Sequence, residues 1–315
     1  MVELRGRDLL SLKDFTSEEL RVILDIAREL KWTYKRGEVR RILESKTIAL
    51  LFEKPSLRTR SSFEVAVAQL GGTPMYMWSE TMWEEPTKDV ALVLSGYVDG
   101  IVARLKTQKS LEELAHYAPI PVINALTDMY HPCQVLADIM TIAEKKGRLE
   151  GIKVAYTWAY CHRARPAGVC HSLMVGCSKL GINLTIACPE GYEPTKEVLK
   201  IAEEEAKRSG SQIEVVNDMK EAVKNADVVY AKNYTPPNLL GKKEEEEMRK
   251  AYKDWIVTSD IMKLAKKDAI FMHCMPVYRE EEVTSEVVDG PQSVIYEEAE
   301  NRLHAQRAVL ALLIP

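Results

Sequence analysis

The chain has 315 residues, 46% of them apolar, and a formal net charge of −4. This length and apolar content are enough for two domains of ordinary size. The small negative charge gives no global basic field for nucleic acid or an anionic membrane. The longest apolar runs are far shorter than a membrane span, and the N-terminus has no apolar signal region. We therefore expect a cytoplasmic protein with no nucleic-acid and no membrane partner.

The cysteines point to the same compartment. The six are scattered along the chain and form no Cys-x-x-Cys pair; they lie at positions 133, 161, 170, 177, 188 and 274. This distribution is typical of free thiols in a reducing environment and not of a disulfide framework.

Apolar runs that predict buried strands alternate with amphipathic stretches that predict helices. A capping box from Thr16 to Glu19 opens the first helix. We expect strands at 47–52, 74–77, 100–104, 121–124, 152–158, 183–188, 212–216, 227–231 and 269–273. Further helices are expected at 61–70, 89–97, 133–146, 197–209, 219–225 and 297–313. The alternation predicts an α/β fold with parallel sheets, in which helix 133–146 joins two units.

Two hydroxyls and two guanidiniums follow the first strand, in the sequence Ser56-Leu57-Arg58-Thr59-Arg60. A helix N-terminus has free N–H groups and carries the positive end of the helix dipole. With these side chains added, the turn predicts a cradle for a phosphate or an oxyanion. The alternative is a capped helix with surface arginines.

Polar side chains also follow two later strands. Arg104 ends the strand 100–104, and His131 and Gln134 follow the strand 121–124. Open α/β sheets bind ligands at the carboxyl ends of their strands. These residues are therefore candidates for the same site as the Ser56–Arg60 turn.

The second half of the chain shows neither a dinucleotide nor a metal motif. No Gly-x-Gly-x-x-Gly follows the strand 152–158, which argues against nucleotide binding of that type. Cys161-His162 and Cys170-His171 have the spacing of no usual zinc finger, and Cys170 is expected on a helix. We expect no metal.

The loop 78–88 is unusual because it holds Trp78 and Trp83 among three carboxylates. Large aromatic side chains on a polar loop indicate an interface or a binding lid. A loop folded back on its own core is the alternative.

Five motifs, in their order along nearly the whole chain, resemble those of the aspartate/ornithine carbamoyltransferase family. The third and fourth are similar to the ornithine branch rather than the aspartate branch. The motifs are Ser56 to Arg60, Arg104, His131-Pro132-Cys133-Gln134, His273-Cys274-Met275-Pro276 and Glu300-Asn301-Arg302.

The resemblance implies two doubly wound parallel-sheet domains. Residues 1–148, joined by the C-terminal helix 297–315, would bind carbamoyl phosphate, and residues 149–296 would bind the acceptor amine. Family catalytic units are trimers with active sites at subunit interfaces, completed by the segment equivalent to 78–88. The implied activity is carbamoyl transfer to the side-chain amine of an ornithine-type amino acid in arginine metabolism, with no metal and no organic cofactor.

Two segments depart from ornithine carbamoyltransferases and resemble the subgroup that uses N-acetyl- or N-succinylornithine. The loop 157–166 is long and bears a proline, which in that subgroup accompanies a trefoil knot in the C-terminal domain. Ala231-Lys232-Asn233-Tyr234 stands where the ornithine-binding Asp and Ser-Met-Gly loop would be. Because an acylated α-nitrogen carries no charge, that Asp is not needed, whereas Lys232 can pair with an α-carboxylate. Tyr278 replaces the Arg usual in that subgroup, and the loop 78–88 is shorter than theirs.

The resemblance also implies a role for each site residue. Ser56, the Leu57 N–H, Arg58 and Thr59 would hold the phosphate, and Gln134 would orient the carbamoyl amide. The groups that polarise the carbonyl and neutralise the leaving phosphate would be Arg104, His131, Thr59 and Arg302. On the acceptor side we expect Leu126, Lys232, Cys274, Met275, Trp83 and Glu282, with backbone carbonyls near Leu126 and Met275 accepting from the carbamoyl NH2. Cys274 is interpreted as a positioning residue and not as a nucleophile, because the amine itself attacks.

Two rival functions remain open. A non-catalytic member would keep the phosphate cradle and act as a binding subunit, although the complete set of donor-site residues argues against it. A carbamoyltransferase for another amine, such as putrescine or an unassigned ureido metabolite, is the second rival. Lys232 favours an acceptor with a carboxylate.

Overall fold

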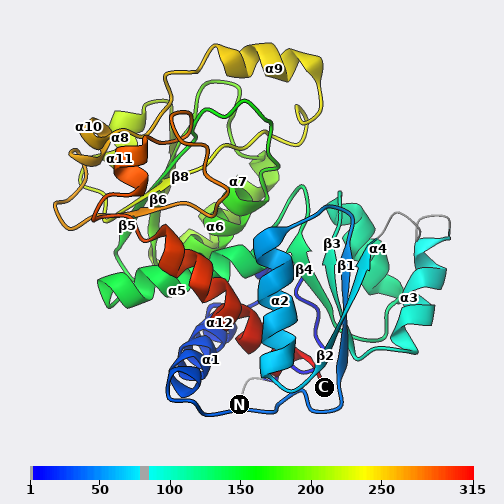
Figure 1. Cartoon of the computed structure of the whole chain (residues 1–315). Coiled ribbons are helices and arrows are strands. Elements are labelled where there is room, and N and C mark those ends of the chain that lie inside the picture. The colour runs from blue at the N-terminus through cyan, green and yellow to red at the C-terminus, as the bar shows by residue number, and fades with distance from the viewer. Residues whose placement is uncertain (1–2, 79–84) are drawn as a thin grey trace. The chain divides into compact units, whose positions relative to one another are not determined.

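The computed structural model describes residues 3–78 and 85–315, so Trp83 lies outside the described residues. The chain divides into two compact units (Figure 1). The first unit comprises Met1–Met140 and Glu300–Pro315, and the second comprises Thr141–Ala299. Each unit contains one parallel sheet with helices packed on it.

The first unit is built on a four-stranded sheet. Its strands are β1 (Thr47–Phe52), β2 (Thr73–Trp78), β3 (Gly100–Arg104) and β4 (Val122–Leu126), and all neighbouring pairs are parallel. The order β2-β1-β3-β4 places β1 and β3 at the centre. The apolar run of β1 is almost wholly buried, as expected for a strand covered on both faces.

Over the described residues, six helices of more than one turn belong wholly or partly to this unit. They are α1 (Ser17–Lys35), α2 (Leu57–Gln69), α3 (Thr87–Ser95), α4 (Gln108–Tyr117), α5 (Pro132–Lys146) and α12 (Ile295–Leu313). A short 3-10 helix, η1, spans Leu12–Asp14. Helices α3 and α4 cover one face of the sheet, where Val90, Leu94 and Leu111 pack against Leu51. Arg307 of α12 donates to the carbonyl of Leu30 on α1 at 3.0 Å, which ties the C-terminal helix to the first helix.

The second unit is built on a five-stranded parallel sheet of order β7-β6-β5-β8-β9. Its strands are β5 (Lys153–Thr157), β6 (Asn183–Ala187), β7 (Ile213–Val216), β8 (Val228–Ala231) and β9 (Ile270–Met272). Its helices are α6 (Gly168–Lys179), α7 (Lys196–Ser209), α8 (Met219–Val223), α9 (Lys243–Lys250), α10 (Ser259–Met262) and α11 (Ser285–Val288). The chain reverses its direction across the sheet between β7 and β8, so right-handed crossovers put α6 and α7 on one face and α8 on the other.

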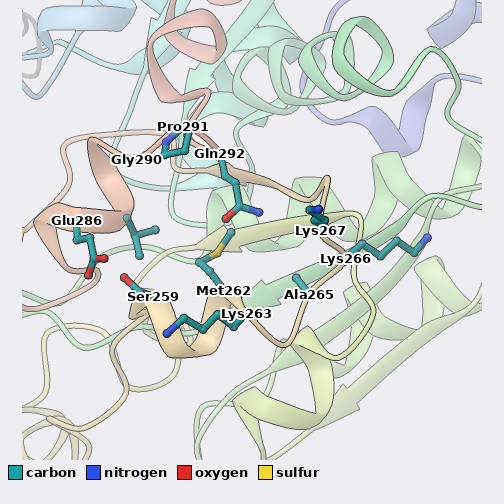
Figure 2. A pocket seen from close by; sticks show the side chains of 11 residues that line it. Ser259, Met262, Lys263, Ala265, Lys266, Lys267, Glu286, Gly290, Pro291 and Gln292 are labelled. Atoms are coloured by element: carbon teal, nitrogen blue, oxygen red, sulfur yellow. The ribbon is translucent and has the colours of Figure 1, made fainter.

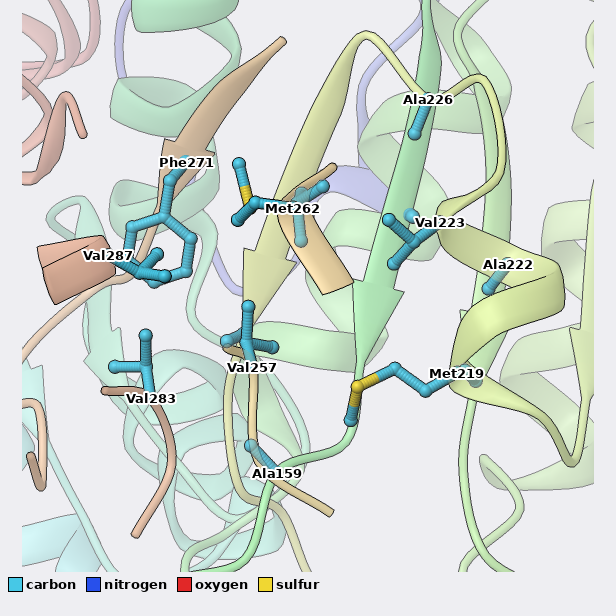
Figure 3. Close-up of a cluster of buried hydrophobic side chains, with 14 of the residues drawn as sticks. Ala159, Met219, Ala222, Val223, Ala226, Val257, Met262, Phe271, Val283 and Val287 are labelled. Atoms are coloured by element: carbon cyan, nitrogen blue, oxygen red, sulfur yellow. The ribbon is translucent and has the colours of Figure 1, made fainter. Parts of the chain in front are cut away.

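One hydrophobic core of the second unit lies under the short helices (Figure 3). Met219 and Val223 of α8, Met262 of α10 and Val287 of α11 pack with Phe271 of β9. These apolar contacts hold the short helices against the sheet at β9.

The predicted fold class is confirmed: both sheets are parallel and doubly wound. The expected bounds of one helix were wrong, because α2 begins at Leu57 and not at residue 61. Ser56 has extended backbone angles and its hydroxyl accepts from the Thr59 N–H, so the helix starts directly after it. The knot expected in the second unit stays a prediction. Within the described ranges, no helix has the length and apolar character needed to cross a membrane.

Candidate active site

In the first unit, the candidate residues lie at the carboxyl ends of β1, β3 and β4. The chain passes from β1 to β2, which pairs with one side of β1, and then to β3, which pairs with the other side. The switch point of this sheet therefore lies between β1 and β3. Phe52 pairs with Arg104 at that edge. Open parallel sheets bind their ligands at such a point.

The N-terminus of α2 supplies free backbone donors there. Ser56 is its N-cap, and Leu57, the first helical residue, is 76% exposed. No acidic residue stands in the first turn of α2 to neutralise its positive end. The exposed N–H groups beside Arg58 therefore form an arrangement suited to a phosphate.

A buried hydrogen-bonded cluster joins four of the sequence motifs. Arg302 of α12 donates from Nη1 to Gln134 Oε1 at 2.5 Å and from Nη2 to Thr59 Oγ1 at 3.1 Å. Arg104 Nη1 donates to the same Thr59 oxygen at 3.5 Å. Thr59, Gln134 and Arg302 are each only 2% exposed. The structure thus brings together residues from α2, β3, α5 and α12.

Asp138 is a member of this cluster that sequence reasoning missed. It is fully buried and accepts from Gln134 Nε2 at 2.7 Å, while Arg302 donates to the other end of the same amide. These two contacts fix the orientation of the Gln134 side chain. A carboxylate one helical turn after Gln134 is the signal that could have revealed it.

His131 lies in the same region and is buried. Burial lowers its pKa well below the ordinary value, and the positive charges of Arg302 and Arg104 lower it further. At neutral pH the imidazole is therefore uncharged. It can donate or accept a hydrogen bond without adding a third buried positive charge.

Arg60 is a correction to the cradle expected from the sequence. Its Nε donates to Glu64 at 2.9 Å, and its guanidinium lies 3.5 Å from the centre of the Tyr76 ring. Glu64 belongs to the same helix and Tyr76 to the edge strand β2, so Arg60 supports the structure around the cradle. Leu126, at the end of β4, has a φ of 148°, and its carbonyl accepts from the Leu105 N–H at 3.2 Å.

In the second unit the switch point lies between β5 and β8, where Thr157 pairs with Ala231. Lys232 is the first residue after β8, and Cys274 is the second residue after β9. The segment after β8 contacts the proline-bearing loop after β5. Thr235 N donates to Arg165 O at 2.7 Å, and Trp158 Nε1 donates to Tyr234 O at 2.7 Å.

Glu282 is the centre of a buried network in this unit. One carboxylate oxygen accepts from Lys232 Nζ at 2.9 Å and from Asn233 N at 3.0 Å. The other accepts from Tyr278 N at 3.0 Å and lies 3.2 Å from His273 Nε2. Burial alone would raise the pKa of Glu282, but Lys232 and His273 lower it below its usual range. Burial of Lys232 would lower its pKa, but the negative charge of Glu282 raises it by more. The pKa of Lys232 is therefore raised above its usual value.

His273 links this network to the backbone at Met275. Met275 N donates to His273 Nδ1 at 2.8 Å, so the imidazole carries its proton on Nε2, facing Glu282. Met275 has a φ of 52°, and Cys274 beside it is buried. The structure therefore places Lys232, Cys274, Met275 and Glu282 in the loops at one edge of the second sheet.

Arg165 and Tyr278 were not among the expected site residues. The Arg165 Nη2 donates to the Tyr278 hydroxyl, and its guanidinium carbon lies 5.3 Å from the centre of that ring. The Nε of Arg165 is buried without a hydrogen-bond partner among the described residues. No described carboxylate forms an ion pair with Arg165, whereas Lys232 has Glu282. Arg165 is therefore a partly buried cation next to the candidate acceptor loops.

A pocket of about 440 Å³ lies elsewhere in the second unit (Figure 2). Lys266 and Lys267 on its wall precede β9, so the pocket lies at the amino end of that strand. Lys232 and Cys274 follow the carboxyl ends. This pocket is therefore not the candidate site.

Comparison with known proteins agrees with the two units. Residues 7–144 match the family model "Aspartate/ornithine carbamoyltransferase, carbamoyl-P binding domain", and residues 150–313 match the corresponding "Asp/Orn binding domain". The chain is 50% identical to an ornithine carbamoyltransferase of Pyrococcus horikoshii over 317 aligned positions, which cover 100% of this chain and 98% of that protein.

Two solved structures resemble the chain equally closely in shape. The ornithine carbamoyltransferase of Pyrococcus furiosus superimposes with a TM-score of 0.91 at 48% identity, covering 100% of this chain and 99% of that one. An acetylornithine transcarbamylase complexed with acetylcitrulline superimposes with a TM-score of 0.92 at 32% identity, covering 98% of this chain and 99% of the other. The chain belongs to the aspartate/ornithine carbamoyltransferase family, and it is a carbamoyltransferase.

Proposed function

We propose that the chain moves the carbamoyl group of carbamoyl phosphate to the side-chain amine of an ornithine-type amino acid, giving a citrulline-type product and phosphate. The observation that carries this proposal is the contact of Arg302 with both Thr59 and Gln134. It gathers a cationic donor, a hydroxyl and an amide at the carboxyl edge of the first sheet. These are the groups that a carbamoyl ester of phosphate requires.

The phosphate of the donor substrate is placed at the N-terminus of α2. The backbone N–H groups that follow Ser56, the Ser56 hydroxyl and the Arg58 guanidinium supply donors to its oxygens. The Leu57 N–H and the Thr59 hydroxyl complete the clamp. Charge-assisted bonds of this kind fix the phosphate's position as well as its affinity.

The carbamoyl carbonyl is polarised by Arg104, neutral His131, Thr59 and Arg302. A neutral amine attacks the carbonyl carbon and a carbon–nitrogen bond forms; the bond to the phosphate oxygen then breaks. The departing phosphate takes a proton of the amine, so no strong side-chain base is needed. The charge that develops on oxygen lies among preorganised donors, and such donors account for most of the rate acceleration in many acyl-transfer enzymes. Gln134, held by Asp138, orients the carbamoyl NH2, with the carbonyl of Leu126 as a further acceptor.

The acceptor is proposed to bind in the loops of the second unit that hold Lys232, Cys274 and Glu282. The four donors around Glu282 leave its carboxylate engaged, so it offers no counter-charge to a free α-ammonium. Arg165, without a described carboxylate partner, adds a positive charge to the same loops. This balance supports an acceptor that ends in a carboxylate and favours an N-acylated ornithine over free ornithine. It disfavours putrescine, whose second end is an ammonium.

A homotrimer with active sites at subunit interfaces and a cytoplasmic location are part of the proposal. Both are expected from the family resemblance and from the composition. Trp83 lies outside the described residues, and its role on the acceptor side stays a prediction. Sedimentation of the purified chain as a species of three times 35.7 kDa is the expected result for the assembly.

An amine panel tests the proposed function. N-acetylornithine, N-succinylornithine, ornithine, lysine and putrescine are each incubated with carbamoyl phosphate, and the release of phosphate and the ureido product are measured. We expect product from ornithine-type amines with a free carboxylate and none from putrescine. If every amine fails while carbamoyl phosphate still raises the melting temperature, the chain is a binding subunit and the proposal is wrong.

A further inference from the structure

We propose that Cys161, His162 and Glu281 form a binding site for a divalent transition-metal ion of the zinc type. The thiol sulfur, an imidazole nitrogen and a carboxylate oxygen of these residues all lie within 4.8 Å of one another. The site belongs wholly to the second unit. It borders the candidate acceptor loops, because the His162 ring packs against Tyr278, but its three ligands do not depend on which amine is the acceptor.

The third ligand is what the sequence could not reveal. Cys161 and His162 are adjacent, and two neighbouring ligands make only half of a site. Glu281, 119 positions further on, lies with its two oxygens 3.0 and 2.9 Å from His162 Nδ1. Sulfur, imidazole and carboxylate are the donor types that Zn²⁺ takes in proteins.

The spacing of the donor atoms is close to that of a tetrahedral centre. Bonds of about 2.0–2.3 Å from zinc to nitrogen, oxygen and sulfur put neighbouring ligand atoms about 3.3–3.7 Å apart. His162 Nδ1 and the Glu281 oxygens lie 2.9–3.0 Å apart, slightly closer than this, and the thiol sulfur lies within 4.8 Å of the other two donor atoms. The side chains of His162 and Glu281 are 44% and 32% exposed, which leaves the fourth position open to water. An open position is typical of a site that exchanges its metal with solution.

Surrounding contacts hold the ligands in place. Arg249 Nη1 donates to the Cys161 carbonyl at 2.7 Å, and His162 N donates to a Glu281 oxygen at 2.9 Å. The His162 ring packs edge-on against Tyr278 at 4.9 Å. Such supporting contacts orient metal ligands and raise their affinity.

Metal binding forms a metal–sulfur bond and releases the thiol proton to solvent, while the imidazole binds in its neutral form through Nδ1. Burial raises the pKa of Cys161 when the site is empty, so the proton is present to be released. Affinity is therefore expected to fall as the pH is lowered, as for other thiolate sites.

The test uses the full-length chain without a histidine tag, freed of metal by a chelator and titrated with Co²⁺. The expected result is one Co²⁺ per chain, a thiolate-to-cobalt charge-transfer band in the near ultraviolet, and displacement of the spectrum by Zn²⁺. The Cys161→Ser variant should lose the charge-transfer band, and Glu281→Gln should weaken binding at least tenfold. His162→Ala, at an exposed position, should weaken binding similarly without disturbing the fold.

Cys170→Ser is the matched control. Cys170 is also buried and also precedes a histidine, but among the described residues no third ligand groups with that pair. This variant should bind Co²⁺ with the spectrum of the unmodified chain. A second readout is the melting temperature, which Zn²⁺ should raise by several degrees in the unmodified chain and in Cys170→Ser but not in Cys161→Ser. Absence of a charge-transfer band at one equivalent of Co²⁺, or its persistence in Cys161→Ser, overturns the proposal.

Discussion

The guanidinium of Arg302 donates from Nη2 to the hydroxyl of Thr59 over 3.1 Å, although the two residues are 243 positions apart. The contact joins the helix that ends the chain to the helix that follows its first strand. Both side chains are almost fully buried, so the charge of Arg302 is directed into the site by its hydrogen bonds and not screened by solvent.

Replacing Arg302 with Lys is expected to lower kcat by about 10²–10³, the usual effect of removing one oxyanion donor. A lysine keeps the charge but cannot donate to Thr59 and Gln134 in fixed directions. Arg307→Lys is the control, because Arg307 lies on the same helix and donates to the Leu30 backbone. The control should lose stability while keeping kcat. Equal activity of the Arg302→Lys and unmodified enzymes would remove Arg302 from the mechanism.

Arg165→Met is expected to raise the acceptor KM by about 10- to 100-fold, because a hydrogen bond to a charged group contributes about 1.5–3 kcal/mol. The KM for carbamoyl phosphate should not change. Tyr278→Phe is the companion variant; it removes the hydroxyl that Arg165 contacts and keeps the ring. Steady-state kinetics with each substrate varied separately provides the measurement. An unchanged acceptor KM in Arg165→Met would place the acceptor carboxylate elsewhere.

Lys232→Met should destabilise the chain by about 3–5 kcal/mol, because it leaves Glu282 buried without its cation. Urea unfolding measures this effect. The double variant Lys232→Met/Glu282→Leu should recover part of the loss, since both charges are then gone. In the Lys232→Ala enzyme, an acceptor KM equal to that of the unmodified chain would show that Lys232 supports the fold only.

The stability of the chain is expected to fall as the pH is lowered from about 6.5 toward 4. Burial and the nearby charges of Lys31 and Arg307 lower the pKa of His304 to about 4, and the pKa of His131 is lowered as well. A histidine whose folded pKa lies below its unfolded value takes up its proton first in the unfolded state, so acid favours unfolding by up to about 1.4 kcal/mol per pH unit and group.

Melting temperatures between pH 7 and 4 test this dependence. His304→Gln should show a shallower fall than the unmodified chain over this window. His116→Gln, on the surface helix α4, serves as the control and should follow the unmodified curve. A His304→Gln curve parallel to that of the unmodified chain would contradict the assignment.

Much of the fold could be predicted from the sequence because its strands are continuous apolar runs. The run 47–52 is β1 to the residue, and Arg104 closes β3 as expected. The start of α2 was misplaced because Ser56 and the polar residues after it resemble a loop, whereas Ser56 caps the helix directly. Local composition does not distinguish a polar turn from the polar first turn of a helix.

The partners of individual site residues were harder to predict. Lys232 was expected to pair with a carboxylate of the substrate, but its ammonium pairs with Glu282, which lies 50 residues later in the chain. Arg60 was expected in the cradle, but its guanidinium lies over the ring of Tyr76 on the next strand. Such pairings depend on which loops meet in space, and a single sequence carries no signal of that.

Carbamoylation of N-acetylornithine by the purified chain, with the Arg302→Lys enzyme assayed beside it, tests the proposed reaction most directly. We expect stoichiometric release of phosphate and a ureido product of the acceptor's side-chain amine, reduced about 10²–10³-fold in the variant. Putrescine should give no product. Failure of N-acetylornithine, N-succinylornithine and ornithine alike, in a chain whose melting temperature still rises with carbamoyl phosphate, would contradict the proposed reaction.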